Sequence, residues 1–172
     1  MENDDLRITL PTGGTVVLRP VTPEDDEFLF AVYASTREQE MAQVTWTDAQ
    51  KMEFLKWQFN LQRQDYDAKH AQRQYDVILV DDQPAGRFWV SRNAEIRLLD
   101  IAILGEFQNR GVGTVLLQRL IDEATRAKKP LRHMVFVLNS DAKRFYERLG
   151  FVVFEEVGAY LHMEWQANKL QS

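Results

Sequence analysis

The sequence predicts an α/β fold in which helices pack against one mixed sheet. The chain has 172 residues, of which 45% are hydrophobic, enough for one substantial core and short for two independent domains. We therefore expect a single domain over residues 1–172. Extended apolar runs occur in groups, and one helical segment joins two of them as a strand–helix–strand crossover, which indicates a mixed sheet.

The N-terminal residues predict a hairpin followed by a helix. Two extended runs, residues 7–10 and 15–20, flank the turn Gly13-Gly14. Thr22 suits an N-cap and Pro23 suits the first position of a helix. The acidic residues that come next favour the positive end of the helix dipole.

A second helix is predicted over residues 48–68, after a capping box formed by residues 47–50. Its stripe at helical spacing is Met52, Leu55, Phe59, Gln62 and Tyr66. The aromatic side chains of this helix are compatible with core packing or with an interface, as in a homodimer. The polar segment 35–47 between the two helices is either a surface linker or an acceptor-binding loop.

Three extended runs follow in the middle of the chain. Residues 75–80 and 85–90 predict a hairpin joined by the turn residues 81–84. Residues 95–104 form the third run, in which the alternation of polar and apolar residues fails at Leu98-Leu99. This strand is therefore either buried on both faces or interrupted by a bulge.

The C-terminal part predicts a helix, a strand, a short helix and two strands. The first helix is amphipathic and ends at Lys128-Lys129-Pro130, where cations suit its negative end. Residues 131–138 read as a strand and residues 142–149 as a helix that Gly150 stops. The last two strands are residues 151–156 and 159–165.

Composition and charge exclude several classes of function. The chain has no cysteine, which removes disulfides, thiolate metal sites and a cysteine nucleophile and fits a reducing compartment. A net charge of -5 argues against nucleic acid as a partner. No apolar run approaches membrane-spanning length, so we expect a cytoplasmic protein with no membrane partner. The three histidines lack the spacing of a metal site, and we expect no metal.

The turn formed by residues 108–114 has the chemistry of a phosphate site. It joins a strand that ends near Leu104 to a helix that begins near Gly111. Unpaired amides of a first helical turn, aided by the dipole, favour a phosphate, and glycine lets the backbone approach it. The dinucleotide fingerprint and the P-loop both fail here, because Leu116 stands where the fingerprint needs glycine and no Gly-Lys-Ser/Thr is present.

The remaining spacing, Gln-x-x-Gly-x-Gly at Gln108, Gly111 and Gly113, resembles the central motif of the GNAT superfamily of N-acetyltransferases. Residues 139–151 resemble the segment after the superfamily's fifth strand, in which Asn, Ala, Tyr and Gly-Phe recur at these separations, and residues 18–25 resemble its opening strand and first helix. The resemblance implies a mixed, mostly antiparallel central sheet of about six to seven strands, with a splayed cofactor-binding strand pair and about four flanking helices.

The resemblance also implies acetyl-CoA as co-substrate and an acetyl transfer to a primary amine of a small molecule or peptide, by direct attack in a ternary complex. Backbone amides at the turn would hold the pyrophosphate, and the preceding strand would pair with pantetheine. Amides of the same strand could also stabilise the oxyanion. The implied cofactor residues are Ile101, Ala102, Ile103, Gln108, Asn109, Arg110, Gly111, Val112, Gly113, Thr114 and Asn139.

Tyr146 is, by the same resemblance, the general acid that protonates the departing thiolate. Its place in an apolar helical stripe would equally suit a core tyrosine. Asn139 precedes this helix and suits an N-cap as well as a cofactor contact. An acyl-CoA-binding sensor that keeps the fold without catalysis is the alternative function.

A base is needed because an amine attacks only when neutral. Glu95 is the first candidate and Asp100 the alternative, with Glu38 and Glu40 in the segment that could cover the site. The competing explanation for Glu95 is an ion pair with Arg97 on the same strand face. The sequence departs from the superfamily pattern at Gly105, where proline is common, and at Gln108, where arginine is at least as frequent.

Overall fold

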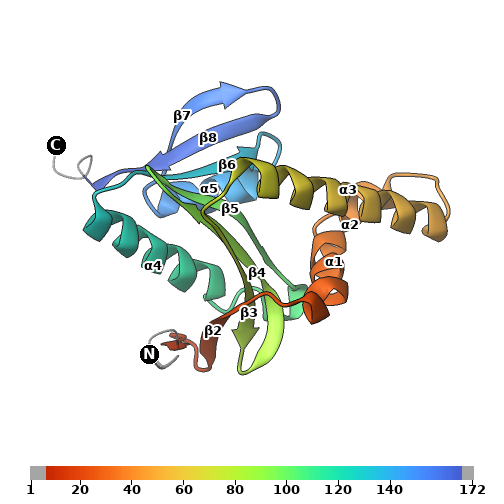
Figure 1. Cartoon of the computed structure of the whole chain (residues 1–172), viewed down its shortest axis with the longest axis horizontal. Helices are drawn as coiled ribbons and strands as arrows, with labels where there is room; N and C mark the ends of the chain where they lie inside the picture. The colour runs from red at the N-terminus through yellow and green to blue at the C-terminus, as the bar shows by residue number, and fades with distance from the viewer. Residues whose placement is uncertain (1–6, 168–172) are drawn as a thin grey trace.

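The computed structural model describes residues 7–167 and contains one eight-stranded sheet in the order β1-β2-β3-β4-β5-β6-β8-β7 (Figure 1). Only β5 and β6 run parallel, and every other neighbouring pair is antiparallel. The strands are β1 (Arg7–Thr9), β2 (Thr15–Pro20), β3 (Arg73–Val80), β4 (Gln83–Arg92), β5 (Ile96–Ile103), β6 (Leu131–Phe136), β7 (Val152–Val157) and β8 (Tyr160–Trp165). The mixed α/β fold is confirmed, with eight strands instead of six to seven because the short β1 extends one edge.

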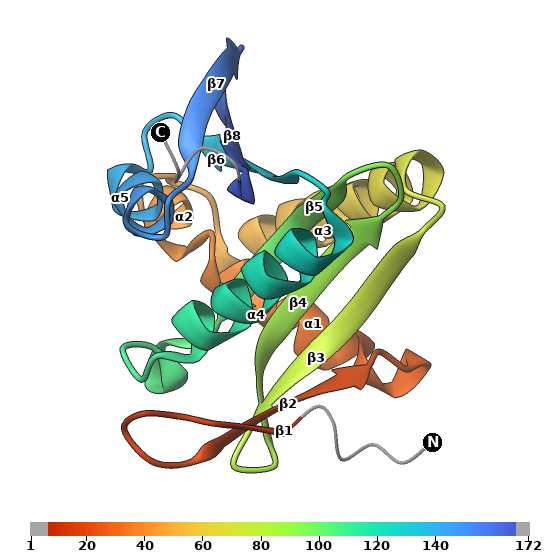
Figure 2. The same cartoon turned by 90° about the vertical axis from the view of Figure 1, so that its left-hand side faces the viewer.

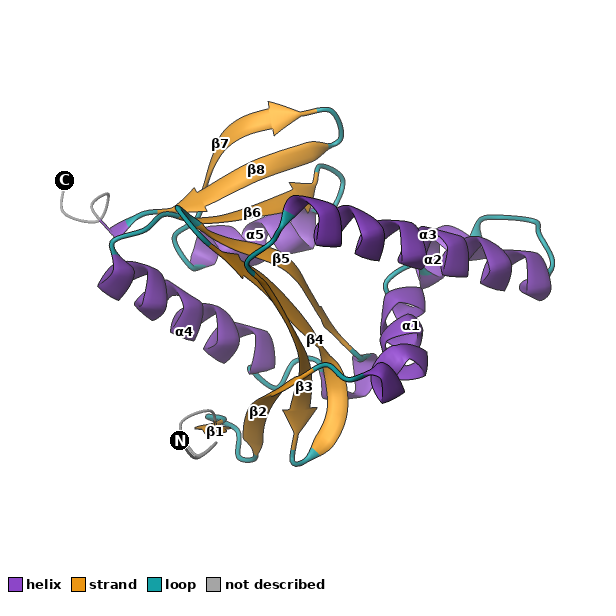
Figure 3. Ribbon diagram, in the orientation of Figure 1, coloured by secondary structure: helices purple, strands orange, loops and turns teal. Residues whose placement is uncertain are grey.

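Helices cover both faces of this sheet, as Figures 2 and 3 show. They are α1 (Asp26–Ser35), α2 (Glu38–Ala42), α3 (Asp48–Lys69), α4 (Val112–Ala127) and α5 (Ser140–Arg148). Because side chains of a strand alternate between faces, the core divides into two clusters. Ile78 packs in the cluster beneath α4, and Val77 in the cluster beneath α1 and α3.

The expected polar segment between the first two helices contains α2, which was not predicted. Its two glutamates, Glu38 and Glu40, lie in the first helical turn, where the dipole favours negative charge. None of its five residues is buried, so no apolar stripe could indicate it.

The predicted helix over residues 48–68 is confirmed as α3, and its capping box forms. Thr47 Oγ1 accepts from the Gln50 amide at 3.2 Å, while the Thr47 amide donates to Gln50 Oε1 at 2.9 Å. Leu55 and Phe59 are buried, but Met52 is 49% exposed. The start of α3 projects beyond the sheet (Figure 1), which leaves that end of the stripe uncovered. None of the described helices is both long and apolar enough to cross a membrane.

The first predicted helix begins as a 3₁₀ turn at Pro23–Asp25, and α1 follows from Asp26. Asp25 Oδ2 accepts from the Thr22 amide at 2.8 Å, so a carboxylate satisfies one of the free donors at this end. The predicted start at Thr22-Pro23 is confirmed, with a tighter first turn.

The hairpin between β3 and β4 has a shorter turn than predicted. Asp81 and Asp82 have positive φ angles of 49° and 64°, as a two-residue turn requires, and Gln83 and Pro84 already pair with β3. Aspartate tolerates this backbone conformation better than most residues. The four-residue turn over residues 81–84 was therefore too long.

A bulge interrupts the pairing of β4 with β5. Trp89 pairs with Asp100 and Val90 with Leu98, so Leu99 is the extra residue. Leu98 packs beneath α4 and Leu99 beneath α3. Both sequence explanations for Leu98-Leu99 are thus correct, since the strand is buried on both faces and also bulged.

The parallel strands β5 and β6 pair only at their beginnings. The register runs from Ile96 with Leu131 to Leu98 with His133, and among residues 7–167 no pairing of these two strands continues beyond it. β5 remains paired with β4 to its end, and β6 remains paired with β8. The second half of β5 therefore has a β6-facing edge that no described strand pairs with.

Candidate active site

The turn before α4 has a left-handed backbone conformation at two of its residues. Gly111 stands at the N-cap with φ of 83°, a left-handed conformation that glycine adopts without strain, and Asn109 is left-handed at 60°. Gln108 Nε2 donates to the Ile103 carbonyl at 2.8 Å, which ties the turn to the end of β5. α4 begins at Val112, so the amides that follow the turn lie at the positive end of the helix dipole, which favours an anion.

A cavity of about 620 Å³, which we call the turn cavity, lies at this turn. It is walled by the end of β5, by the first turn of α4 and by α5. Nine of the predicted cofactor residues line it: Ile101, Ile103, Gln108, Asn109, Gly111, Val112, Gly113, Thr114 and Asn139. The turn and the second half of β5 are therefore brought together, as the resemblance implied.

Two predicted cofactor residues do not line the turn cavity. Ala102 is 8% exposed and pairs with Arg87 of β4. Its side chain is therefore not part of the cavity wall, and only its backbone lies along the β5 edge. The Arg110 side chain pairs with Asp81, 3.2 Å from Nη2 to Oδ2, and its carbonyl accepts from Thr12. Its guanidinium is thus engaged with the β3–β4 turn.

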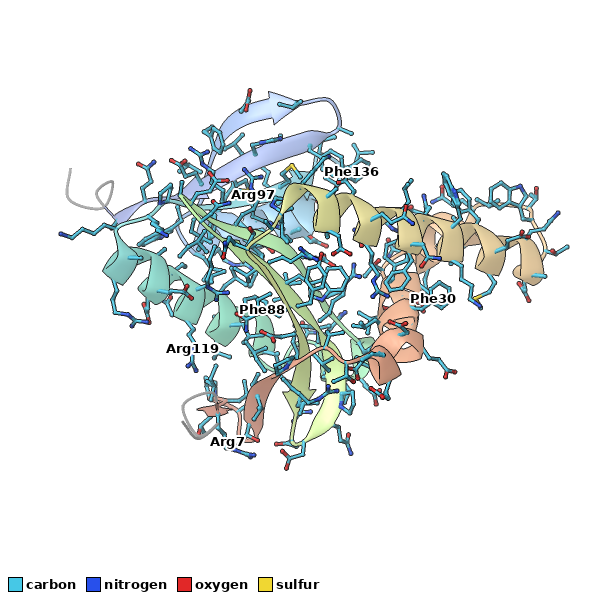
Figure 4. All side chains as sticks on the ribbon, viewed as in Figure 1. Arg7, Phe30, Phe88, Arg97, Arg119 and Phe136 are labelled. Carbon is cyan, nitrogen blue, oxygen red and sulfur yellow. The ribbon has the colours of Figure 1, made fainter. Side chains whose placement is uncertain are left out.

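A second cavity of about 590 Å³, which we call the helix cavity, lies between β5 and helices α1 and α3. Arg97 and Phe136, two of its lining residues, are labelled in Figure 4. Four residues line both cavities: Ile101, Asn139, Ala142 and Tyr146. The two cavities therefore meet at Tyr146, where a bound cofactor and a second substrate could come into contact.

Tyr146 lies at this junction in an aromatic environment and is 3% exposed. Its ring is 4.6 Å from the His133 ring and 5.4 Å from the Phe151 ring, centroid to centroid. Burial, with the nearby charge of Asp100, raises the pKa of the Tyr146 hydroxyl. The hydroxyl is therefore protonated at neutral pH, as a proton donor must be.

His133 also lies at the junction, on β6. Its Nδ1 is 2.9 Å from the Leu98 carbonyl, so Nδ1 carries the proton in this contact. Burial lowers the pKa of the imidazole, which leaves the ring neutral near pH 7. At the bulged residue, the Tyr66 hydroxyl donates a hydrogen bond to the Leu99 carbonyl at 3.0 Å. His133 and Tyr66 thus bind the successive carbonyls of Leu98 and Leu99.

Asn139 caps α5, as the sequence predicts. Its Oδ1 accepts from the Ala142 amide at 3.0 Å, and the residue lines both cavities. The same side chain therefore caps the start of α5 and lies where the two cavities meet.

The two candidate bases are in different surroundings. Asp100 lines the helix cavity and forms an ion pair with Arg87. Both carboxylate oxygens of Glu95 are held by arginines, Oε1 at 2.8 Å from Arg97 and Oε2 at 2.7 Å from Arg132. Glu95 does not line the helix cavity, and the ion pair that competed with the catalytic explanation is present.

The other acidic candidates, Glu38 and Glu40, border a third, outer cleft of about 1050 Å³ between α2 and the start of α5. Glu40 also reaches the helix cavity and pairs with Arg37 at 3.2 Å. The segment 35–47 therefore lies beside the helix cavity, as an acceptor-binding loop would.

Several residues of the helix cavity were not predicted from the sequence. Arg87 is 2% exposed and stacks on Trp89, 4.3 Å from the ring centroid, with its Nη2 donating to Gln62 at 3.1 Å. The available signal was a lone charge inside the otherwise apolar run 85–90. Arg37 and His133 carried no comparable signal, because each is one of several polar residues in its segment.

Comparisons with known proteins find similarity to acetyltransferases. A family model described as an acetyltransferase (GNAT) domain matches residues 71–153. An uncharacterised N-acetyltransferase of Methanocaldococcus jannaschii is 30% identical over 161 residues, which cover 87% of this chain and 66% of the relative. CgeE of Bacillus subtilis, named as an N-acetyltransferase, is 29% identical over 66 residues, 38% of this chain and 26% of that protein. The matched parts are less than two thirds of either relative.

Solved structures share the fold at low sequence identity. The PaiA N-acetyltransferase of Thermoplasma acidophilum, solved in complex with coenzyme A, has a TM-score of 0.67 and 17% identity over 88% of this chain and 98% of that one. An acetyltransferase of Thermus thermophilus has a TM-score of 0.62 and 21% identity over 87% and 94%.

Proposed function

Because this chain belongs to the GNAT superfamily of acetyltransferases, we propose that it moves an acetyl group from acetyl-CoA to a primary amine of a small molecule or peptide. The amine attacks the thioester carbonyl directly while both substrates are bound. The observation that carries the proposal is the meeting of the turn cavity and the helix cavity at Tyr146.

The turn cavity is proposed to hold CoA. Amides of residues 110–114 bind the pyrophosphate at the positive end of α4. Pantetheine lies along residues 101–103, where β5 no longer pairs with β6. An extended amide-bearing chain satisfies the free backbone groups of such an edge, as an added strand would. This placement directs the thioester toward Asn139 and Tyr146.

The helix cavity is proposed to hold the amine. Asp100 is the better placed base, because it lines this cavity while Glu95 is engaged by two arginines. The ammonium proton passes to Asp100, directly or through water, and the neutral nitrogen attacks the carbonyl. Backbone amides of β5 stabilise the oxyanion. The C–S bond then breaks, and Tyr146 donates its proton to the thiolate of CoA. The attacking nitrogen passes its second proton to the Tyr146 phenolate, directly or through water, which gives the neutral amide and restores the hydroxyl.

Calorimetry with acetyl-CoA, followed by an assay for released CoA thiol with a library of amines, tests the function. Saturable binding and amine-dependent thiol release are expected. Binding without release for any amine would favour an acyl-CoA sensor over the enzyme, and absence of binding would refute both.

A further inference from the structure

Arg87 is the buried cation of the helix cavity. It lies in the middle of β4 and is 2% exposed, yet two of its three guanidinium nitrogens, Nε and Nη1, have no hydrogen-bond partner among the described residues. Its Nη2 serves both Gln62 and Asp100. A buried donor without a partner is costly, so these two groups indicate a missing acceptor.

Arg37 adds a second guanidinium to the same cavity. Its Nε is also buried without a hydrogen-bond partner in the described part of the chain. The guanidinium carbons of Arg37 and Arg87 lie 5.3 and 5.6 Å from the centroid of the Tyr33 ring. One aromatic ring thus orients both cations, and three of their buried nitrogens lack an acceptor among the described residues.

The acidic groups that line this cavity already face cations. Glu40 pairs with Arg37 at 3.2 Å, Asp65 pairs with Lys69 at 2.8 Å, and Asp100 pairs with Arg87. The third lining arginine, Arg97, is bound by Glu95. Asp100 Oδ2 faces Arg87, so the other buried side-chain atoms of this cavity that lack a hydrogen-bond partner among the described residues are the donors of Arg37 and Arg87. A polycationic amine would meet these two guanidinium groups with no free anion to balance them.

We propose that the amine acceptor carries a carboxylate, which Arg87 and Arg37 bind while the amino group lies toward Asp100 and Tyr146. The acceptor is then an amino acid or a short peptide with a free carboxylate. A planar carboxylate offers two oxygens to guanidinium donors, and such charge-assisted contacts are strong in a water-poor site. This inference rests on the proposed function, because it identifies the substrate class of the same site.

Matched acceptors test the inference. Amino acids and short peptides are compared with their own carboxamides and with spermidine, in an assay of CoA thiol release at fixed acetyl-CoA. Removal of the negative charge is expected to lower kcat/KM at least about tenfold, mostly through KM. Equal or better turnover of the carboxamides, or of spermidine, would overturn the inference.

Variants locate the effect in the two arginines. Arg37→Gln is expected to raise KM for the carboxylate acceptor about tenfold and to leave KM for its carboxamide within about twofold. Arg63→Gln is the matched control, since Arg63 also stacks on one ring and pairs with one carboxylate and is 32% exposed against 33% for Arg37. Arg87→Gln should act more strongly, and a thermal melt checks its folding. A similar rise in KM for both forms of the acceptor would contradict the proposal.

The two proposals fail in different ways. Absence of acetylation for every amine would refute the proposed function, whatever the acceptor charge. Acetylation that ignores the carboxylate would refute only the assignment of Arg37 and Arg87.

Discussion

The ring of Tyr146 lies against the imidazole of His133, with 4.6 Å between centroids and 46° between the planes. Tyr146 lies on α5 and His133 on β6. Their contact holds the Tyr146 side chain at the junction of the turn and helix cavities.

Tyr146→Phe is expected to lower kcat about 100-fold or more, because the departing thiolate loses its proton donor, and to leave acetyl-CoA affinity within about twofold. Steady-state kinetics and calorimetry measure the two effects. Tyr75→Phe is the control, since it removes a tyrosine hydroxyl that donates to Asp67 outside both cavities. Unchanged kcat in Tyr146→Phe would assign Tyr146 a packing role.

Asp100→Asn and Glu95→Gln separate the two candidate bases. Asp100→Asn should reduce kcat, because the amide cannot accept the ammonium proton. Glu95→Gln should keep turnover but lower the free energy of unfolding by about 1 kcal/mol, since it weakens two partly exposed ion pairs. The reverse pattern, with turnover lost only in Glu95→Gln, would restore Glu95 as the base.

Gly86→Ala is expected to destabilise the fold by at least about 2 kcal/mol. A Cβ at this position would lie 2.1 Å from the Ala102 carbonyl oxygen, so β4 and the cofactor strand could not keep their spacing. Urea unfolding measures the change. Gly105→Ala is the matched control, because no atom lies within 4 Å of its Cβ position. A Gly86→Ala protein as stable as Gly105→Ala would contradict the close approach of the strands.

Acid should weaken the contact between Asp25 and Arg19. Hydrogen bonds from Arg19, at 2.8 and 2.9 Å, lower the pKa of Asp25 to about 2 in spite of its partial burial. A carboxylate whose folded-state pKa lies below its unfolded value stabilises the fold above about pH 4 and loses that contribution as the pH falls toward 2.

Asp25→Asn should therefore cost about 1–2 kcal/mol at pH 6, with about half of that difference gone at pH 3. Urea unfolding of both proteins across this range gives the difference directly. Asp82→Asn is the control, since it affects a highly exposed pair with Arg7, and such pairs contribute little to stability. A constant penalty for Asp25→Asn between pH 6 and 3 would contradict the lowered pKa.

Local chemistry accounts for the parts of the fold that the sequence predicts well. Thr47 and Gln50 satisfy each other's helix-end groups, and Gly111 adopts a left-handed conformation at the start of α4, so neither depends on distant residues. Even the irregularity at Leu98-Leu99 was visible as a break in alternation. The helix α2 was missed because it buries none of its residues and therefore leaves no periodic pattern.

The site was harder to predict because its decisive contacts join residues far apart in sequence. Along the chain Glu95 was the first candidate base and Asp100 the alternative, whereas in the fold Asp100 lines the helix cavity and Arg132 from β6 pairs with Glu95. The partners of Arg87 were equally hard to predict. A charge in an apolar strand indicates a special environment, but its partners Gln62 and Tyr33 come from α3 and α1.

The bulge at Leu99 decides which face of the sheet each later residue of β5 points to. If Leu99 paired with Trp89 in a regular ladder, Asp100 would move opposite Phe88, and every later side chain of the strand would move to the opposite face. Ile101 and Ile103 would then exchange places with Asp100 and Ala102, and a carboxylate would face the core beneath α4. A single unpaired residue is therefore what turns Asp100 toward the helix cavity and Ile103 toward the turn cavity.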